Sequence, residues 1–208
     1  MSKAVFIDLE TTGLNPVTEE IIEFAIVVVD TDTWVPIEGM TLTGILYTPQ
    51  VVLRLLDDSF VKPVREMHNK NGLFPKLRKY MDEKVAPREY LDIEKRILES
   101  IRSFGVKGLP VWGSSVHFDR KFLEQKMPTL NEYFHYRVVD SSSDMERLKA
   151  TRPELWKKID KDPSKYVSPE GSAEHRALED LMHSIDMERR INKWLTGPAA
   201  ACSDLTDA

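Results

Sequence analysis

Residues 4–10 read AVFIDLE, and this short stretch predicts the first strand of a sheet. Every second side chain of a strand lies on the same face, so Asp8 and Glu10 would lie together on the face opposite Ile7. The next residues, TTGLNP (11–16), contain a glycine and a proline and predict a turn. We therefore expect a strand that ends in two carboxylates beside a turn.

The segments that follow predict the rest of a sheet. Residues 21–30, IIEFAIVVVD, are rich in β-branched side chains and predict a second strand, and MTLTGILYTP (40–49) predicts a third. Two further strands are expected at LPVWGSS (109–115) and YFHYRVVD (133–140). An antiparallel meander followed by alternating helix and strand predicts an α/β fold, a mixed sheet flanked by helices.

Helices are expected between and after these strands, and the two longest have apolar stripes that include Leu91 and Leu178. The predicted helical segments are 50–80 (two short helices), 88–105, 117–127, 141–150 and 172–194. We expect one domain over residues 1–196 and a disordered tail over 197–208, where small and polar residues follow the last helix.

Composition narrows the possible classes of protein. The chain has 208 residues and a formal net charge of −5, which argues against a broad basic face for gripping a long duplex. Its one cysteine, Cys202, excludes a disulfide framework and a cysteine-based zinc site. The apolar run before Asp8 is too short for a secretory signal, and no apolar stretch is long enough to span a membrane. We expect an unexported, cytoplasmic protein with no membrane partner.

The carboxylates Asp8 and Glu10 are candidate ligands for a divalent cation, because two oxygen ligands on one strand face can share a hard ion. The alternative is a solvated strand face, since acid-x-acid triplets arise by chance in a chain with 34 acidic residues. The metal site is favoured because an unpaired carboxylate in an apolar strand is costly to desolvate.

Two more acidic positions and a histidine add to this set. Asp119 opens the helix after strand 109–115, at the sheet edge where α/β folds bind ligands, although acids also favour helix N-termini without any function. His175 and Asp180 lie five positions apart in EHRALEDL. His175 could accept a proton near neutral pH, and the alternative is a capping or surface histidine.

The candidate site residues belong to motifs that follow one another in a recognisable order along the sequence. FIDLETTGL, GSSVHFDRKFLEQKMP, YFHYR and HRALEDL follow one another in a way that resembles the DEDDh family of 3′-to-5′ exonucleases, which have a ribonuclease H-like fold. Within that family the chain is most similar to the oligoribonucleases, over roughly residues 4–195. Arg176 stands four positions before Asp180, where the other branch of the superfamily has tyrosine, so the histidine branch is indicated.

The resemblance implies a two-metal-ion hydrolase. Asp8 and Glu10 match its first motif, Asp119 its second, and His175 with Asp180 its third. The four carboxylates would hold two divalent ions, Mg²⁺ or Mn²⁺, because an all-oxygen ligand set suits both. His175 would be the general base, and the products would be nucleoside 5′-monophosphates.

The resemblance also implies how substrate binds. Leu14 matches a leucine that wedges against the terminal bases, and His68 corresponds to a histidine of the family's site. A cap for the 5′-phosphate of short oligomers would include Ser115, Arg137 and Ser142, because a guanidinium and hydroxyls bind phosphate well. The two serines could equally be turn or helix caps, and His68 a surface-loop histidine. Family members are homodimers, so a homodimer is implied.

The chain departs from the family pattern at three places. Ser59 and Phe60 stand near the position of a family tryptophan, and Ser114 replaces a usual asparagine. The segment 153–172 is longer than the family pattern predicts. These departures concern substrate length and sugar preference rather than the hydrolytic residues.

Three hypotheses follow. The main one is a metal-dependent 3′-to-5′ exonuclease that degrades short single-stranded oligoribonucleotides. The second is a general or proofreading-like exonuclease on single-stranded DNA. The third is a catalytically silent module of the same fold that binds nucleic acid or another partner, against which the presence of all five expected site residues argues. The net charge favours short substrates, because few phosphates need little basic surface.

Overall fold

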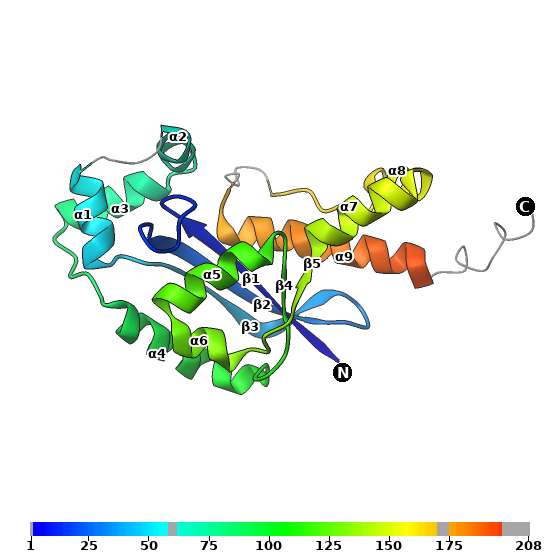
Figure 1. The fold of residues 1–208 in the computed structure, drawn as a ribbon, viewed down its shortest axis with the longest axis horizontal. Coiled ribbons are helices and arrows are strands. Elements are labelled where there is room, and N and C mark those ends of the chain that lie inside the picture. The colour runs from blue at the N-terminus through cyan, green and yellow to red at the C-terminus, as the bar shows by residue number, and fades with distance from the viewer. Residues whose placement is uncertain (1, 58–61, 170–174, 197–208) are drawn as a thin grey trace, which may run out of the picture.

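A mixed five-stranded sheet forms the centre of the computed structural model, which describes residues 2–57, 62–169 and 175–196. The strand order is β3-β2-β1-β4-β5 (Figure 1). Neighbours are antiparallel for β1 with β2 and β2 with β3, and parallel for β1 with β4 and β4 with β5. The strands are β1 (Lys3–Thr11), β2 (Ile21–Asp30), β3 (Val35–Ile45), β4 (Val111–Gly113) and β5 (Val138–Asp140). The predicted mixed α/β sheet is confirmed.

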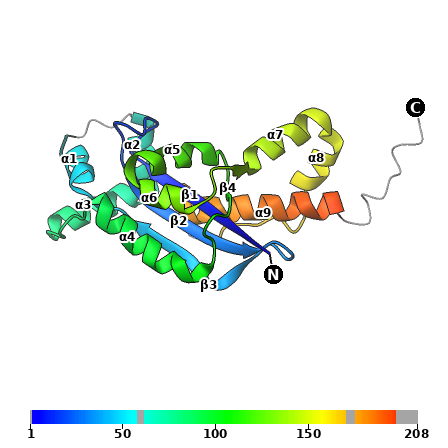
Figure 2. The ribbon, with the colours of Figure 1, turned by 60° about the horizontal axis from the view of Figure 1, so that its bottom comes forward.

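Helices cover both faces of the sheet. The described helices are α1 (Pro49–Asp57), α2 (Lys62–Lys70), α3 (Leu73–Asp82), α4 (Tyr90–Ile101), α5 (Val116–Lys126), α6 (Pro128–Tyr133), α7 (Ser141–Thr151), α8 (Pro153–Asp160) and α9 (Ala177–Thr196), with a 3₁₀ turn at Arg102–Phe104. Helices α4, α5 and α6 pack on the face that carries Val5, Ile7 and Leu9. Helix α9 packs on the opposite face, against Ala4 and Phe6 (Figure 2).

The alternation in β1 thus separates two cores. Its odd-numbered apolar residues lie under α4 to α6, and its even-numbered ones lie under α9. Burial of apolar surface on both faces explains why β2 is apolar along almost its whole length. Because Asp8 and Glu10 continue the even-numbered series, they end on the α9 side of the sheet.

Several predicted boundaries were wrong. Segment 50–80 contains three helices rather than two, and the strand predicted over 133–140 is only β5, because Tyr133 ends helix α6. Helix α9 begins at Ala177, so His175 precedes the helix. The tail 197–208 with Cys202, and Ser59 with Phe60, lie outside the described residues.

Two residues of the predicted apolar stripes face solvent. Leu91 is 58% exposed and Leu178 is 36% exposed. In α4 the buried line includes Glu94 in place of Leu91, because the Glu94 carboxylate accepts a hydrogen bond from Leu130 N at 2.8 Å. In α9 the buried line passes through Ala177 and Leu181, one residue away from Leu178.

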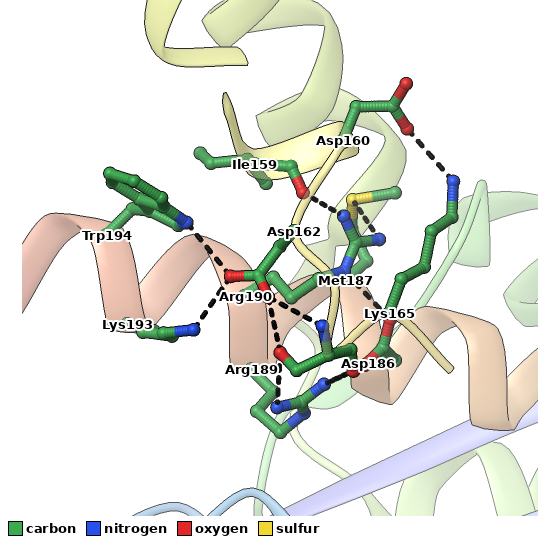
Figure 3. Close-up of polar contacts among 11 residues, drawn as sticks. Ile159, Asp160, Asp162, Lys165, Asp186, Met187, Arg189, Arg190, Lys193 and Trp194 are labelled. Atoms are coloured by element: carbon green, nitrogen blue, oxygen red, sulfur yellow. Dashed lines mark hydrogen bonds and ion pairs between the residues drawn. The ribbon is translucent and has the colours of Figure 1, made fainter. Parts of the chain in front are cut away.

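Of the lengthened segment 153–172, the structure describes residues 153–169, which form α8 and then an extended stretch of chain that returns along α9. Figure 3 shows how polar side chains of α9 fix it. The buried guanidinium of Arg190 donates to Ile159 O at 2.5 Å and to Asp186 Oδ2 at 2.8 Å. Asp162 accepts from Lys193 Nζ at 2.8 Å and Trp194 Nε1 at 3.2 Å.

Farther along, this segment approaches the N-terminal half of α9. Tyr166 donates its hydroxyl to Glu179 at 3.1 Å, and Ser168 lies 3.0 Å from His183 Nε2. The segment therefore runs antiparallel to α9, toward the end of the helix that carries Asp180. Within the ranges described, no helix combines the length and apolar character that crossing a bilayer requires.

Candidate active site

Three carboxylates meet at the end of β1. Asp8 and Glu10 extend from the strand and Asp180 from the first turn of α9, and their ligand oxygens lie within 4.8 Å of one another. Glu10 is only 7% exposed, so the alternative of a solvated strand face is wrong for this residue. The arrangement follows from the packing of α9 on the even-numbered face of β1. Such a set of oxygen ligands can hold a divalent cation.

Asp119 approaches the same place from the other side of the sheet. It lies in the first turn of α5, is buried, and accepts a hydrogen bond from Leu9 N at 2.9 Å. This contact is possible because β4 pairs with β1 only at Val5 and Phe6, which leaves the end of β1 without a parallel neighbour. The Asp119 carboxylate therefore provides Leu9 N with the acceptor that a neighbouring strand would otherwise provide. It also brings a fourth negative charge close to Asp8.

Burial and mutual repulsion raise the pKa values of this carboxylate group. Burial, followed by the charges of Asp180 and Glu23, raises the pKa of Glu10 to about 9. Burial, followed by the charges of Asp119 and Glu10, raises the pKa of Asp8 well above its ordinary value. Burial also raises the pKa of Asp119 to about 7, against the hydrogen bond from Leu9. A divalent cation would relieve this repulsion, so the residues present fit a metal site.

The pKa shifts predict how the metal-free protein responds to pH. The folded protein holds protons on Glu10 and Asp119 up to about pH 9 and 7, whereas unfolding returns both carboxyls to their ordinary pKa values near 4. The folded state therefore binds more protons across this window, and its stability falls as pH rises from about 4.5 to about 9. We expect the Tm measured in EDTA to fall by several degrees over that window, and Glu10→Gln to flatten the slope.

Divalent metal should reverse this trend. Only ionised carboxylates bind the ion, so added Mg²⁺ or Mn²⁺ should raise the Tm more at high pH than at low pH. Glu38→Gln, at an exposed site on β3, is the matched control and should keep the wild-type slope. Equal slopes for Glu10→Gln and the wild type would contradict the assignment of the raised pKa to Glu10.

His175 lies at the edge of the carboxylate group. Its side chain is exposed. Burial raises the pKa of Asp180, and His175 opposes that increase, which places the ring within electrostatic reach of that carboxylate. The backbone of His175 has φ 54°, the left-handed region that non-glycine residues rarely adopt. The exposed position leaves the imidazole open to water and to a bound substrate.

Glu23 and Arg176 are two site residues that sequence reasoning missed. Glu23 lies directly across from Glu10 in the β1–β2 register. Its carboxylate accepts from Arg176 Nε at 2.9 Å and from Ala177 N at 3.2 Å, so it pairs with an arginine and caps the start of α9. An acidic residue in the otherwise apolar stretch 21–29 was the sequence signal that could have found it.

The predicted substrate-binding residues are spread over the neighbouring surface. Leu14 projects from the turn after β1 and is 80% exposed. Ser115 N donates to Asp140 Oδ1 at 3.0 Å and to Ser142 Oγ at 3.1 Å, so the two serines do lie together, at the C-terminal ends of β4 and β5. Arg137 precedes β5, at the opposite end of that strand from Ser142, and its guanidinium lies over the Tyr136 ring.

His68 is not a surface residue, so the surface-loop alternative is wrong. Its side chain is fully buried, its Nε2 lies 2.9 Å from Thr11 O, and its ring packs on Phe74 with centroids 5.1 Å apart. Its Nε2 is also 4.0 Å from Glu10 Oε2. The histidine therefore lies behind the carboxylate group, and contact with substrate stays a prediction. Ser114, the other departure that is described, bonds Ser184 Oγ at 2.9 Å.

The chain is similar in sequence to several known proteins. The family model RNase_T, described as exonuclease, matches residues 5–187. The oligoribonuclease of Chromobacterium violaceum is 32% identical over 186 residues, 89% of this chain and 91% of the relative. The mitochondrial oligoribonuclease of Homo sapiens is 33% identical over 184 residues, 88% of this chain and 69% of the relative.

A solved structure shares the fold. The zinc-bound form of an Escherichia coli ExoI–ssDNA complex superposes with a TM-score of 0.59 at 20% sequence identity. The match covers 93% of this chain but only 41% of that protein. At this level of identity the likeness concerns the fold alone.

Proposed function

The chain belongs to the exonuclease family, as its sequence motifs predicted, and on that premise we propose that this 3′-to-5′ exonuclease hydrolyses short single-stranded oligoribonucleotides to nucleoside 5′-monophosphates. The observation that carries the proposal is the meeting of Asp8, Glu10 and Asp180, with Asp119 beside them, in the order that the oligoribonuclease resemblance requires. Relatives called oligoribonucleases, similar over nearly the whole chain, support the choice of substrate.

The carboxylates would hold two divalent ions, Mg²⁺ or Mn²⁺. When bound, such ions supply Lewis-acid stabilisation of the charge on attacking and leaving oxygens and make water more acidic. Asp8, Glu10 and Asp180 provide the converging oxygens. Asp119 orients the end of β1 through Leu9 N and offers its second oxygen. Each carboxylate must ionise to serve as a ligand, which the positive charge of the ions favours.

His175 would remove the proton from the attacking water. Its exposed ring lies near Asp180, whose charge would stabilise the imidazolium that forms. The role needs an imidazole that is open to water, and the exposed side chain of His175 meets this condition. His175 would later lose the proton to solvent.

The surface around the site suits a short substrate. Leu14 offers an exposed apolar side chain for a base, and the paired Ser115 and Ser142 offer hydroxyls for a phosphate. The net charge of −5 leaves little long-range attraction for an extended polyanion. Arg137, the homodimer and the cytoplasmic location implied by the sequence stay predictions.

The decisive experiment compares substrates of different length and sugar. We expect the rate on RNA dimers to exceed that on RNA 20-mers by at least about tenfold. The reason is that Leu14 and the two serines would contact only the terminal nucleotides, so a longer substrate gains no further binding from them. DNA of both lengths supplies the comparison for the second hypothesis. Equal rates on 20-mers and dimers would reject the oligoribonuclease assignment in favour of a general single-strand exonuclease.

A further inference from the structure

The corner between α2 and α3 connects two parts of the site that are far apart in the sequence. Asn71, in this corner, donates its side-chain amide to His175 O at 2.5 Å. The same amide lies 3.3 Å from His68 Nδ1, and His68 Nε2 lies 2.9 Å from Thr11 O. A continuous series of hydrogen bonds thus joins the backbone of Thr11, the residue after Glu10, to the backbone of His175.

Only one assignment of donors and acceptors fits this series of hydrogen bonds. Thr11 O can only accept, so His68 carries its proton on Nε2 and its Nδ1 must accept from Asn71. The Asn71 amide has two N–H groups, one for His68 and one for His175 O. Its Oδ1 accepts from Leu73 N at 3.0 Å, which fixes the amide orientation. Each polar side-chain group of the buried residues His68 and Asn71 therefore has a hydrogen-bond partner.

The backbone of His175 needs such support. Its φ of 54° is a left-handed conformation that is unfavourable for a non-glycine residue and persists only where the surroundings impose it. Asn71 holds the carbonyl of His175. Glu23 holds the side chain of Arg176 and the N–H of Ala177, the two residues that follow. The backbone is therefore anchored at His175 and directly after it.

We propose that Asn71 is a positioning residue, which acts by fixing the backbone of His175 so that its imidazole faces the carboxylate group. His68 supports the Asn71 amide and ties it to the end of β1. The inference rests on the proposed role of His175 as general base. Asn71 itself is buried, and its hydrogen bonds to the described residues involve no carboxylate, so we expect metal binding not to depend on it.

The test is a double-mutant cycle of Asn71→Ala and His175→Ala, assayed on a short RNA with Mn²⁺. Asn71→Ala should lower kcat by about 10–100-fold, since a displacement of about 1 Å can cost that much, and should leave KM within about threefold. His175→Ala should lose most turnover. In the His175→Ala background, Asn71→Ala should lower kcat by less than about twofold, because residues that act through one group are not additive.

Two further variants separate positioning from general stability. Asn71→Asp keeps the size and the acceptor for Leu73 N but removes the donor, so it should lose turnover as Asn71→Ala does. Asn69→Ala, at an exposed asparagine of the same helix end, is the matched control and should keep wild-type turnover. Mn²⁺ affinity, followed by electron paramagnetic resonance of the free ion, should be unchanged in all four variants.

The outcomes separate this inference from the proposed function. Full turnover in His175→Ala would remove the general-base role itself. If His175→Ala is inactive as expected, then wild-type turnover in Asn71→Ala, or an equal loss in both backgrounds, would overturn the positioning role. Loss of the folded circular dichroism signal in both Asn71 variants would also overturn it, because the role would then be stability.

Discussion

Replacing Asp8 with asparagine is expected to lower exonuclease turnover by about 10³-fold or more while the protein stays folded. Asp8 lies at the centre of the carboxylate group, where burial and the charges of Asp119, Glu10 and Asp180 raise its pKa. Asparagine keeps the shape but removes the charge that neutralises a divalent ion. Loss of several kcal/mol of transition-state stabilisation corresponds to this factor, since each 1.36 kcal/mol is about tenfold. Release of mononucleotides from a labelled RNA dimer with Mg²⁺ measures it.

The control for Asp8→Asn must change the net charge equally. Asp32→Asn does so at an exposed turn between β2 and β3, away from the carboxylate group, and should leave turnover unchanged. Removing a buried repulsive charge should also raise the Tm of the metal-free Asp8→Asn variant. Comparable turnover in Asp8→Asn and the wild type would refute the metal-site assignment. An intact RNA dimer with both proteins would instead favour the silent binding module.

Replacing Asp186 with alanine is expected to give the largest loss of stability, about 3–5 kcal/mol, because it leaves a buried guanidinium without its partner. Arg190 is 1% exposed and bonds Asp186 Oδ2 at 2.8 Å, while Arg189 bonds the other oxygen (Figure 3). For a chain of this size the Tm should fall by about 6–20 °C. Urea unfolding with the metal-free protein measures the loss.

An exposed ion pair provides the control for Asp186→Ala. Lys157 and Glu154 pair at 2.7 Å on the surface of α8, and Lys157→Ala should cost less than about 0.5 kcal/mol. Arg190→Met in the Asp186→Ala background should restore part of the lost stability, because the unpaired charge is removed with its partner. Equal losses for Asp186→Ala and Lys157→Ala would show that the buried pair does not hold the segment 159–168 to α9.

Local patterns in the sequence predicted much of the scaffold. The alternation of AVFIDLE predicted that Asp8 and Glu10 share a face, and the two cores on either side of β1 follow that alternation. The turn was predicted from its glycine and proline, the second strand from its β-branched residues, and the last helix from its apolar periodicity. Such patterns are readable because neighbours in the chain fix which face a side chain occupies. The predicted burial of Leu91 and Leu178 was wrong. Successive residues of a helix are rotated by about 100° about its axis, so a small error in position changes the face on which a side chain lies.

Long-range contacts could not be predicted in this way. Asp119 was expected on motif order, but its bond to Leu9 N depends on β4 leaving β1 early. The pairing of Glu23 with Arg176 spans the sheet and α9, and the Asn71 bond to His175 O joins segments 104 residues apart. The partners in each of these pairs are far apart in the sequence, so no local pattern of residues indicates that they are in contact.

The mixed sheet, the shared face of Asp8 and Glu10 and the family could all be predicted from the sequence, because periodicity and motif order are properties of the chain. The burial of His68, the capping of α9 by Glu23 and the left-handed backbone of His175 could be seen only in the folded protein. The physical reason is the packing of α9 and the α2–α3 corner around the end of β1. That packing buries polar groups that must then find hydrogen-bond partners wherever the fold brings them.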